Sequence, residues 1–247
     1  MRIDTALKTA ILNVNTFSDG RLNSFFRKSF RTIKKQGIEN VVIDLRENSG
    51  GSIFSSIRLA QYLVQQPFKV ADTVAAIDRS FKYKKHIRPW FIYWLSMHFA
   101  GKKEQDGRIH FRFFERKQFK PKKHHHFNGH TYVVTGGYTF SAATMLAGIV
   151  QGQPNTTIVG EETGGGAYGN TAVHLPTITL PNSKVRVVLP LFRLVTDKDR
   201  IKNGRGILPD VEVLPTSQAI KLGVDAKLEK VRALIRALNN TNNSGAR

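Results

Sequence analysis

The segment TYVVTGGYTFSAATMLAGIV (residues 131–150) passes from an apolar strand, through two glycines and an aromatic turn, into a helix of small residues. Ser141 stands where that helix begins, and two interpretations of it are open. Its hydroxyl could accept a hydrogen bond from a free N–H of the first turn, as N-cap serines do. Alternatively, it is a nucleophile at the positive end of the helix dipole, with the N–H of Ala142 as one arm of an oxyanion hole.

Two further predicted strands also end in turns that contain glycine. ENVVIDLREN (39–48) is followed by SGG, and NTTIVG (155–160) is followed by EETGGG. Ligands usually bind at the carboxyl ends of the strands of an α/β sheet, and glycine lets backbone N–H groups approach them closely. Gly50 and Gly51 therefore supply a second set of amides for an oxyanion hole. TGGG lacks the G-x-x-x-x-G-K-[ST] pattern, so it is not a phosphate-binding loop.

The rest of the chain extends the alternation of strands and helices, which predicts an α/β fold. The further predicted elements are helices at 23–36, 55–66 and 227–240, a hairpin at 178–195 and an edge strand at 204–213. We expect one domain over residues 1–236. The polar residues 237–247 are expected to form a disordered tail.

The composition is that of an ordinary globular protein with an unusual excess of positive charge. Hydrophobic residues make up 40% and charged residues 23%, but the formal net charge is +20. Such an excess favours acidic partners, which are nucleic acid, anionic membranes or acidic peptides. Because the basic residues are scattered and no readout motif is present, we do not expect a specific nucleic-acid partner. The lack of cysteine excludes disulfides, thiolate metal sites and a cysteine nucleophile.

The aromatic segment PWFIYWLSMHFAG (89–101) lies between the basic runs KYKKHIR and GKK. It is shorter than the ~20 apolar residues of a membrane-spanning helix. Two interpretations are open: a helix that makes peripheral contact with a membrane surface, and an amphipathic helix that covers a core. The first 14 residues lack the ordered regions of a signal peptide.

Four motifs, in the right order between residues 41 and 213, resemble those of the carboxyl-terminal processing (tail-specific) serine peptidases. That superfamily includes the tricorn protease core and the interphotoreceptor retinoid-binding domains. The motifs are VVIDLRENSGG, GGYTFSAATMLAGIVQ, IVGEETGGG and GRGILPDVEV. The resemblance implies a Clp-protease/crotonase-like α/β fold of stacked β-β-α units. It also implies a serine peptidase that forms an acyl-enzyme on Ser141, with an oxyanion hole from Ala142 and Gly50, with Gly51 beside it. We predict no metal and no cofactor.

The chain departs from this family at the general base. Gly166 occupies the lysine position of the "T-x-G-K-G" segment, and no "DGH" segment precedes the DLR strand. A glutamate position of the tricorn-like branch falls on Asn203, which could orient an imidazole. His174, shortly after TGGG, is the other accessory candidate, and a core or edge-strand histidine is the alternative for it. A serine hydroxyl without a base is a poor nucleophile, so we expect this chain to be the core of a longer peptidase whose upstream part carries the histidine.

The remaining motif residues are expected to be structural. Asp44 and Arg46 match scaffold residues of the DLR segment, for which an ion pair or a turn-locking role is expected, and Asp210 of LPD is expected to be structural too. Two functions stay open: a peptidase acting on peptide or protein substrates, with acidic ones preferred if the basic residues line the cleft, and a catalytically impaired peptide- or lipid-binding domain on the same fold. The resemblance implies the periplasm or cell envelope if a signal peptide lies upstream.

Overall fold

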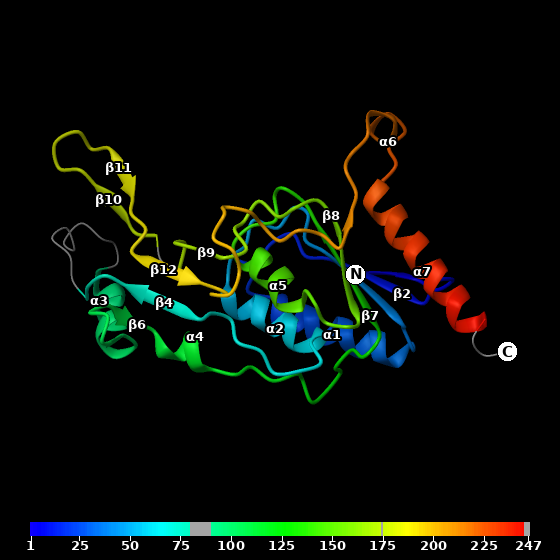
Figure 1. Cartoon of the computed structure of the whole chain (residues 1–247), viewed down its shortest axis with the longest axis horizontal. Helices are drawn as coiled ribbons and strands as arrows, with labels where there is room; N and C mark the ends of the chain where they lie inside the picture. The colour runs from blue at the N-terminus through cyan, green and yellow to red at the C-terminus, as the bar shows by residue number, and fades with distance from the viewer. Residues whose placement is uncertain (80–89, 174, 245–247) are drawn as a thin grey trace. The chain divides into compact units, whose positions relative to one another are not determined.

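The computed structural model describes residues 1–79, 90–173 and 175–244. The contacts within the chain group it into two compact units (Figure 1). Unit 1 consists of residues 1–67, 119–166 and 204–247, and unit 2 of residues 68–118 and 167–203. The expected single domain over residues 1–236 stays a prediction.

Unit 1 is built around a six-stranded sheet with the order β1-β2-β3-β7-β8-β13. β1 is antiparallel to β2, and all other neighbours are parallel. The strands are β1 (Arg2–Asp4), β2 (Thr9–Asn13), β3 (Asn40–Asp44), β7 (His130–Thr135), β8 (Thr156–Gly160) and β13 (Val211–Glu212). Strands of a parallel sheet are covered on both faces, which explains the continuous apolar runs VVI and YVV. The three strands expected to share a sheet, β3, β7 and β8, are neighbours in it.

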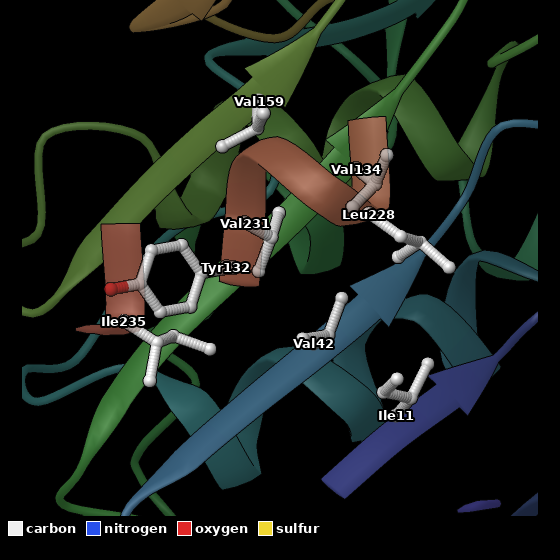
Figure 2. Packing of buried hydrophobic residues seen from close by; sticks show 8 residues of the cluster. All are labelled: Ile11, Val42, Tyr132, Val134, Val159, Leu228, Val231 and Ile235. Atoms are coloured by element: carbon white, nitrogen blue, oxygen red, sulfur yellow. The ribbon is translucent and has the colours of Figure 1, made fainter. Parts of the chain in front are cut away.

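Helices cover both faces of this sheet (Figure 1). On one side α2 (Ile53–Leu63) packs against α1 (Leu22–Lys35) and α5 (Ala142–Val150). On the other side α7 (Ala226–Ser244) places Leu228, Val231 and Ile235 on apolar side chains of the strands. Figure 2 shows this cluster, whose strand residues are Ile11, Val42, Tyr132, Val134 and Val159.

Two features of the carboxyl-terminal region differ from the sequence-based expectation. The short helix α6 (Ser217–Lys221) was not predicted; the side chain of Thr216 accepts a hydrogen bond from the Ala219 N–H and caps it. The polar tail expected to be disordered from residue 237 is helical through Ser244. Packing of Ile235 on the sheet anchors α7, and each residue added to an anchored helix gains a hydrogen bond without a new nucleation cost.

Unit 2 contains an antiparallel sheet with the order β5-β6-β4-β12-β9. The strands are β4 (Thr73–Ala76), β5 (Lys102–Lys103), β6 (Ile109–His110), β9 (Gly169–Asn170) and β12 (Phe192–Val195). Two helices, α3 (Trp90–Phe99) and α4 (Arg112–Arg116), belong to this unit, and β10 (Thr177–Thr179) pairs with β11 (Arg186–Val188) in a separate hairpin. The helix in the aromatic segment is present, and the hairpin predicted over 178–195 is confirmed only up to β11, because its last residues form β12, which pairs with β4 and β9 instead.

Candidate active site

Three loops are joined by hydrogen bonds at the carboxyl ends of β3, β7 and β8. The Phe140 N–H donates to the carbonyl of Asn48 at 3.0 Å, and the Gly165 N–H donates to the carbonyl of Thr139 at 3.0 Å. The hydroxyl of the buried Thr139 also donates to the Leu45 carbonyl at 2.9 Å. The edge at which the sequence predicts a site is thus a single hydrogen-bonded assembly of the NSGG, GGYTF and EETGGG turns.

Ser141 occupies a strained position at the start of α5. Its backbone has φ 52° and ψ −117°, although it is not glycine. Such a conformation costs about 1–3 kcal/mol and persists where the surrounding structure dictates it. Strained strand-to-helix turns present the nucleophilic serines of α/β-hydrolases. The local geometry therefore holds the Ser141 side chain at a defined, partly exposed position.

The N-cap interpretation of Ser141 is wrong in this structure. The Ser141 side chain makes no capping hydrogen bond, whereas Ser52, at the start of α2, accepts one from the Ser55 N–H. Nor does the Ser141 hydroxyl bond to any other residue in the described part of the chain. The Ser141 hydroxyl at this positive-φ position is therefore unengaged among the described residues.

Gly50 packs directly against Ser141. A Cβ built on Gly50 would lie 2.7 Å from the Ser141 Cβ and 3.2 Å from the Ala142 nitrogen. The Gly50 φ of 109° also lies in the region that favours glycine. Glycine at this position thus lets the NSGG turn approach the start of α5. The structure brings Ser141, Gly50 and Ala142 together, as the motifs predict.

The hydrogen bonds distinguish between the two candidate glycine amides. The Gly50 N–H already donates to Oδ1 of the buried Asn48 at 2.8 Å. Phe17 forms a parallel bridge opposite Gly51: its N–H donates to the Gly50 carbonyl, and its carbonyl accepts from the Ser52 N–H. In such a bridge the N–H of the central residue, Gly51, points away from Phe17. Within the residues that the structure describes, neither the Gly51 N–H nor the Ala142 N–H has a hydrogen-bond partner. Of the three amides predicted for the oxyanion hole, those of Gly51 and Ala142 are therefore without a partner, and that of Gly50 is not.

No general base is paired with Ser141 among the described residues of unit 1. Gly166, at the family's lysine position, forms a backbone bridge with Gly206. His126 bonds to the Val64 carbonyl, and His130 bonds to Thr157 at the opposite end of β7 from Ser141. Burial lowers the pKa of His130.

The two accessory candidates lie elsewhere. Asn203 is an exposed residue of unit 2. His174 lies outside the described residues.

A partly buried ion pair that the sequence analysis missed supports the end of β7. Lys227 of α7 is 9% exposed; its Nζ donates to the Thr135 carbonyl at 3.0 Å and pairs with Glu161. A Cβ on Gly136 would lie 3.2 Å from this Nζ, so the pair directly underlies the turn that leads to Ser141. No local pattern marks Lys227, because Thr135 and Glu161 are far from it in the sequence.

The DLR segment contains the expected structural ion pair. Arg46 bonds to Asp44 at 2.6 Å and, in addition, to Asp225 at 2.8 Å. The hydrogen bonds that Arg46 donates to Asp44 raise the pKa of Arg46 against the opposing effect of burial. Burial opposes ionisation of Asp225, but the Arg46 hydrogen bond outweighs it and lowers the Asp225 pKa. Asp210 accepts a hydrogen bond from the Ile158 N–H at 2.7 Å, which is the structural role expected for it.

Comparison with known proteins agrees with this geometry. The sequence signature of peptidase family S41 matches residues 8–213. Mature CPAF complexed with lactacystin aligns with a TM-score of 0.70 at 17% identity, over 94% of this chain and 52% of that chain. A putative peptidase from Parabacteroides merdae aligns with a TM-score of 0.63 at 18% identity, over 92% and 61% of the two chains. The photosystem II D1 C-terminal processing protease aligns with a TM-score of 0.52 at 21% identity, over 89% of this chain and 47% of that chain.

This chain spans about half to three-fifths of the length of these solved structures. No curated protein matches it. The predicted α/β fold class is confirmed, since these peptidases share the Clp-protease-like α/β fold and align over nearly the whole chain. Because the family signature covers all four motifs and most of the chain, the protein belongs to peptidase family S41.

Proposed function

We propose that this chain is the catalytic core of a serine peptidase and that Ser141 is its nucleophile. The observation that carries the proposal is the Ser141 hydroxyl, held at positive φ against Gly50 and next to the Ala142 amide; neither group has a hydrogen-bond partner among the described residues. A hydroxyl used for capping would point into the helix. The strained backbone instead leaves this hydroxyl open to a substrate, at the positive end of α5.

In the proposed reaction the Ser141 Oγ attacks the carbonyl carbon of a peptide, and its proton passes to a general base. The negative charge that develops on the carbonyl oxygen is stabilised by the N–H groups of Gly51 and Ala142. Collapse of the tetrahedral intermediate expels the amine, which takes up a proton, and leaves an ester on Ser141. Water then hydrolyses the ester. In this scheme Asn48 is a positioning residue, because its side chain holds the Gly50 amide and donates to the Val14 carbonyl at 2.7 Å.

The base is proposed to come from the longer protein. Gly166 leaves the lysine position of the family without a side chain. A serine hydroxyl without a base is a weak nucleophile near neutral pH. We therefore expect the 247-residue chain alone to cleave peptides weakly or not at all. Asn203 and His174 stay candidates for accessory roles.

Acidic peptides are the proposed substrate class. Unit 2 contains 18 Lys and Arg against 7 Asp and Glu, a net charge of +11. A cavity of about 340 Å³ in this unit is lined by Arg108, Arg193 and Lys202. None of the three forms a salt bridge with a described residue. Because like charges around one cavity repel, an acidic peptide segment would relieve that repulsion on binding.

Gly166 also favours a second candidate function, a catalytically impaired peptide- or lipid-binding domain on the same fold. The experiment that separates the two is labelling of the full-length protein with a fluorophosphonate probe, together with a peptide-cleavage assay. Peptidase function predicts labelling of the wild type and loss of labelling in Ser141→Ala. Ser217→Ala, at an exposed serine that starts α6, is the matched control. Absence of labelling and cleavage, with peptide binding retained, would select the binding domain.

A further inference from the structure

We propose that unit 2 docks on an anionic membrane surface through the exposed face of α3 and the two lysines of β5. This proposal is independent of the chemistry at Ser141. It corresponds to the membrane-surface interpretation of the aromatic segment, while the buried Met97 shows that the same helix also covers a core.

The exposed face of α3 is apolar and mostly aromatic. Phe91, Trp94, Leu95 and Phe99 are 55%, 39%, 41% and 80% exposed, whereas Met97 on the same helix is fully buried. These four apolar residues recur at i, i+3, i+4 and i+8, which places them on one face of a helix, and the exposed His98 at i+7 lies on that face with its ring against Trp94. The rings of Phe91 and Trp94 lie 6.1 Å apart, so they form a continuous surface. An exposed apolar surface of this kind marks an interaction site.

The dimensions of α3 fit a surface contact. Its 10 residues extend about 15 Å, half of the ~30 Å hydrocarbon core of a bilayer. In the described part of the chain, no helix is long and apolar enough to cross a membrane. Tryptophan, phenylalanine and leucine beside lysine are the residues that place a helix at the boundary between headgroups and acyl chains.

The charge next to α3 identifies the partner as anionic. Both residues of β5, Lys102 and Lys103, are exposed and follow α3 directly. Each basic residue near an anionic bilayer strengthens binding about fivefold. A second copy of the chain is disfavoured as the partner, because docking two copies through this face would bring together two units of net charge +11.

The β10–β11 hairpin adds a second element of the same character. Its exposed apolar residues Val185, Val187 and Val188 alternate with the basic residues Lys184 and Arg186. Figure 1 shows the hairpin standing away from the sheet of unit 2. Of the 22 exposed large apolar side chains of the described residues, 12 belong to unit 2. Unit 2 therefore contains both exposed apolar side chains and an excess of basic residues, which a peripheral membrane protein needs.

The tryptophans allow a direct test. The chain contains 2 Trp, Trp90 and Trp94, and both belong to α3. Their emission should shift to the blue when the protein is mixed with vesicles of phosphatidylcholine and phosphatidylglycerol, and brominated acyl chains should quench it. Phosphatidylcholine alone should bind more weakly, and added salt should weaken binding to the anionic vesicles.

Two variants separate the apolar and charged contributions in a vesicle co-sedimentation assay. Leu95→Glu/Phe99→Glu should weaken binding at least about tenfold. Lys102→Glu/Lys103→Glu should weaken binding about fivefold or more per charge, and mainly on anionic vesicles. Ile220→Glu, at an exposed position in unit 1, should bind like the wild type. Circular dichroism confirms that each variant is folded.

Two outcomes would overturn the proposal. One is wild-type protein that shows neither a shift in tryptophan emission nor co-sedimentation with anionic vesicles. The other is self-association in sedimentation equilibrium that Leu95→Glu/Phe99→Glu abolishes, without vesicle binding by the wild type. That result would assign the face to a second copy of the chain.

Discussion

Gly50 and Ser141 lie so close together that no side chain fits between them: a Cβ on Gly50 would approach the Ser141 Cβ to 2.7 Å. The contact joins the turn between β3 and α2 to the turn between β7 and α5, at the carboxyl ends of the two strands. It sets the distance between the NSGG turn and the start of α5, and therefore the geometry of any oxyanion hole that the two turns share.

Gly50→Ala tests this contact. The new methyl group must displace Ser141, and alanine is also strained at the Gly50 φ of 109°. We expect a loss of about 1–3 kcal/mol in the free energy of unfolding, measured by urea denaturation, and loss of fluorophosphonate labelling. Gly137→Ala is the matched control, because a Cβ there meets nothing within 4 Å. Wild-type stability and labelling in Gly50→Ala would contradict the assigned contact.

The stability of Ser141 variants tests whether the hydroxyl caps α5. Loss of an N-cap costs about 0.5–2 kcal/mol, but the Ser141 hydroxyl makes no capping bond. Ser141→Ala should therefore change the free energy of unfolding by less than about 0.5 kcal/mol. Ser141→Gly should raise stability by about 1 kcal/mol, since glycine tolerates φ 52°. A loss of stability in Ser141→Ala as large as that of a cap would restore the capping role.

The Lys227–Glu161 pair is expected to hold the end of β7 in place. Lys227→Met leaves the Thr135 carbonyl and the Glu161 carboxylate without their buried donor. Because Glu161 is partly exposed, we expect a loss of about 1–3 kcal/mol, below the cost of breaking a fully buried pair. Lys227→Met/Glu161→Gln should recover part of this loss. Urea denaturation of the four proteins in the double-mutant cycle measures the coupling, and strict additivity would show that there is none.

His110 of unit 2 is expected to make stability depend on pH. Burial opposes protonation of the ring, but hydrogen bonds to Asp106 at 3.1 Å and to Glu115 at 2.8 Å outweigh it and raise the His110 pKa. The protonated form is therefore favoured in the folded state. Its stabilising contribution is fully present below the ordinary histidine pKa of about 6.5 and is lost as pH rises through the raised value.

Thermal unfolding of the wild type and of His110→Gln between about pH 5 and pH 8 measures this dependence. The difference in melting temperature between the two proteins should shrink as the pH rises. A difference that stays constant over this range would show that His110 does not titrate with unfolding.

The basic cavity of unit 2 predicts a preference for acidic peptides that decreases with salt. Arg193→Glu/Lys202→Glu reverses two of the charges that line it and should weaken the binding of an acidic peptide. Fluorescence anisotropy in the Ser141→Ala background measures binding without turnover, so the outcome does not depend on catalysis. Lys221→Glu, in α6 of unit 1, is the control for a change in overall charge. Equal affinity for acidic and basic peptides at low salt would exclude this cavity as the selecting site.

Much of unit 1 is determined by local sequence. The apolar runs before Asp44, Gly136 and Gly160 are long enough only for buried strands, and each is followed by a turn that contains glycine. Parallel strands place these turns at one edge of the sheet, so the proximity of the Gly50 turn to Ser141 follows from the pattern and the family resemblance. Strand periodicity and glycine turns are properties of neighbouring residues, and a single sequence displays them directly.

The tertiary structure alone decided which groups at that edge are free. The Asn48 side chain occupies the Gly50 amide, whereas the Gly51 amide has no partner among the described residues, and the Ser141 hydroxyl at its positive φ makes no capping bond. Lys227 reaches Thr135 and Glu161 only because α7 folds back on the sheet, and the same packing keeps the polar end of α7 helical. These outcomes depend on hydrogen bonds and contacts between residues far apart in the chain, whereas periodicity reports only the face on which a residue lies.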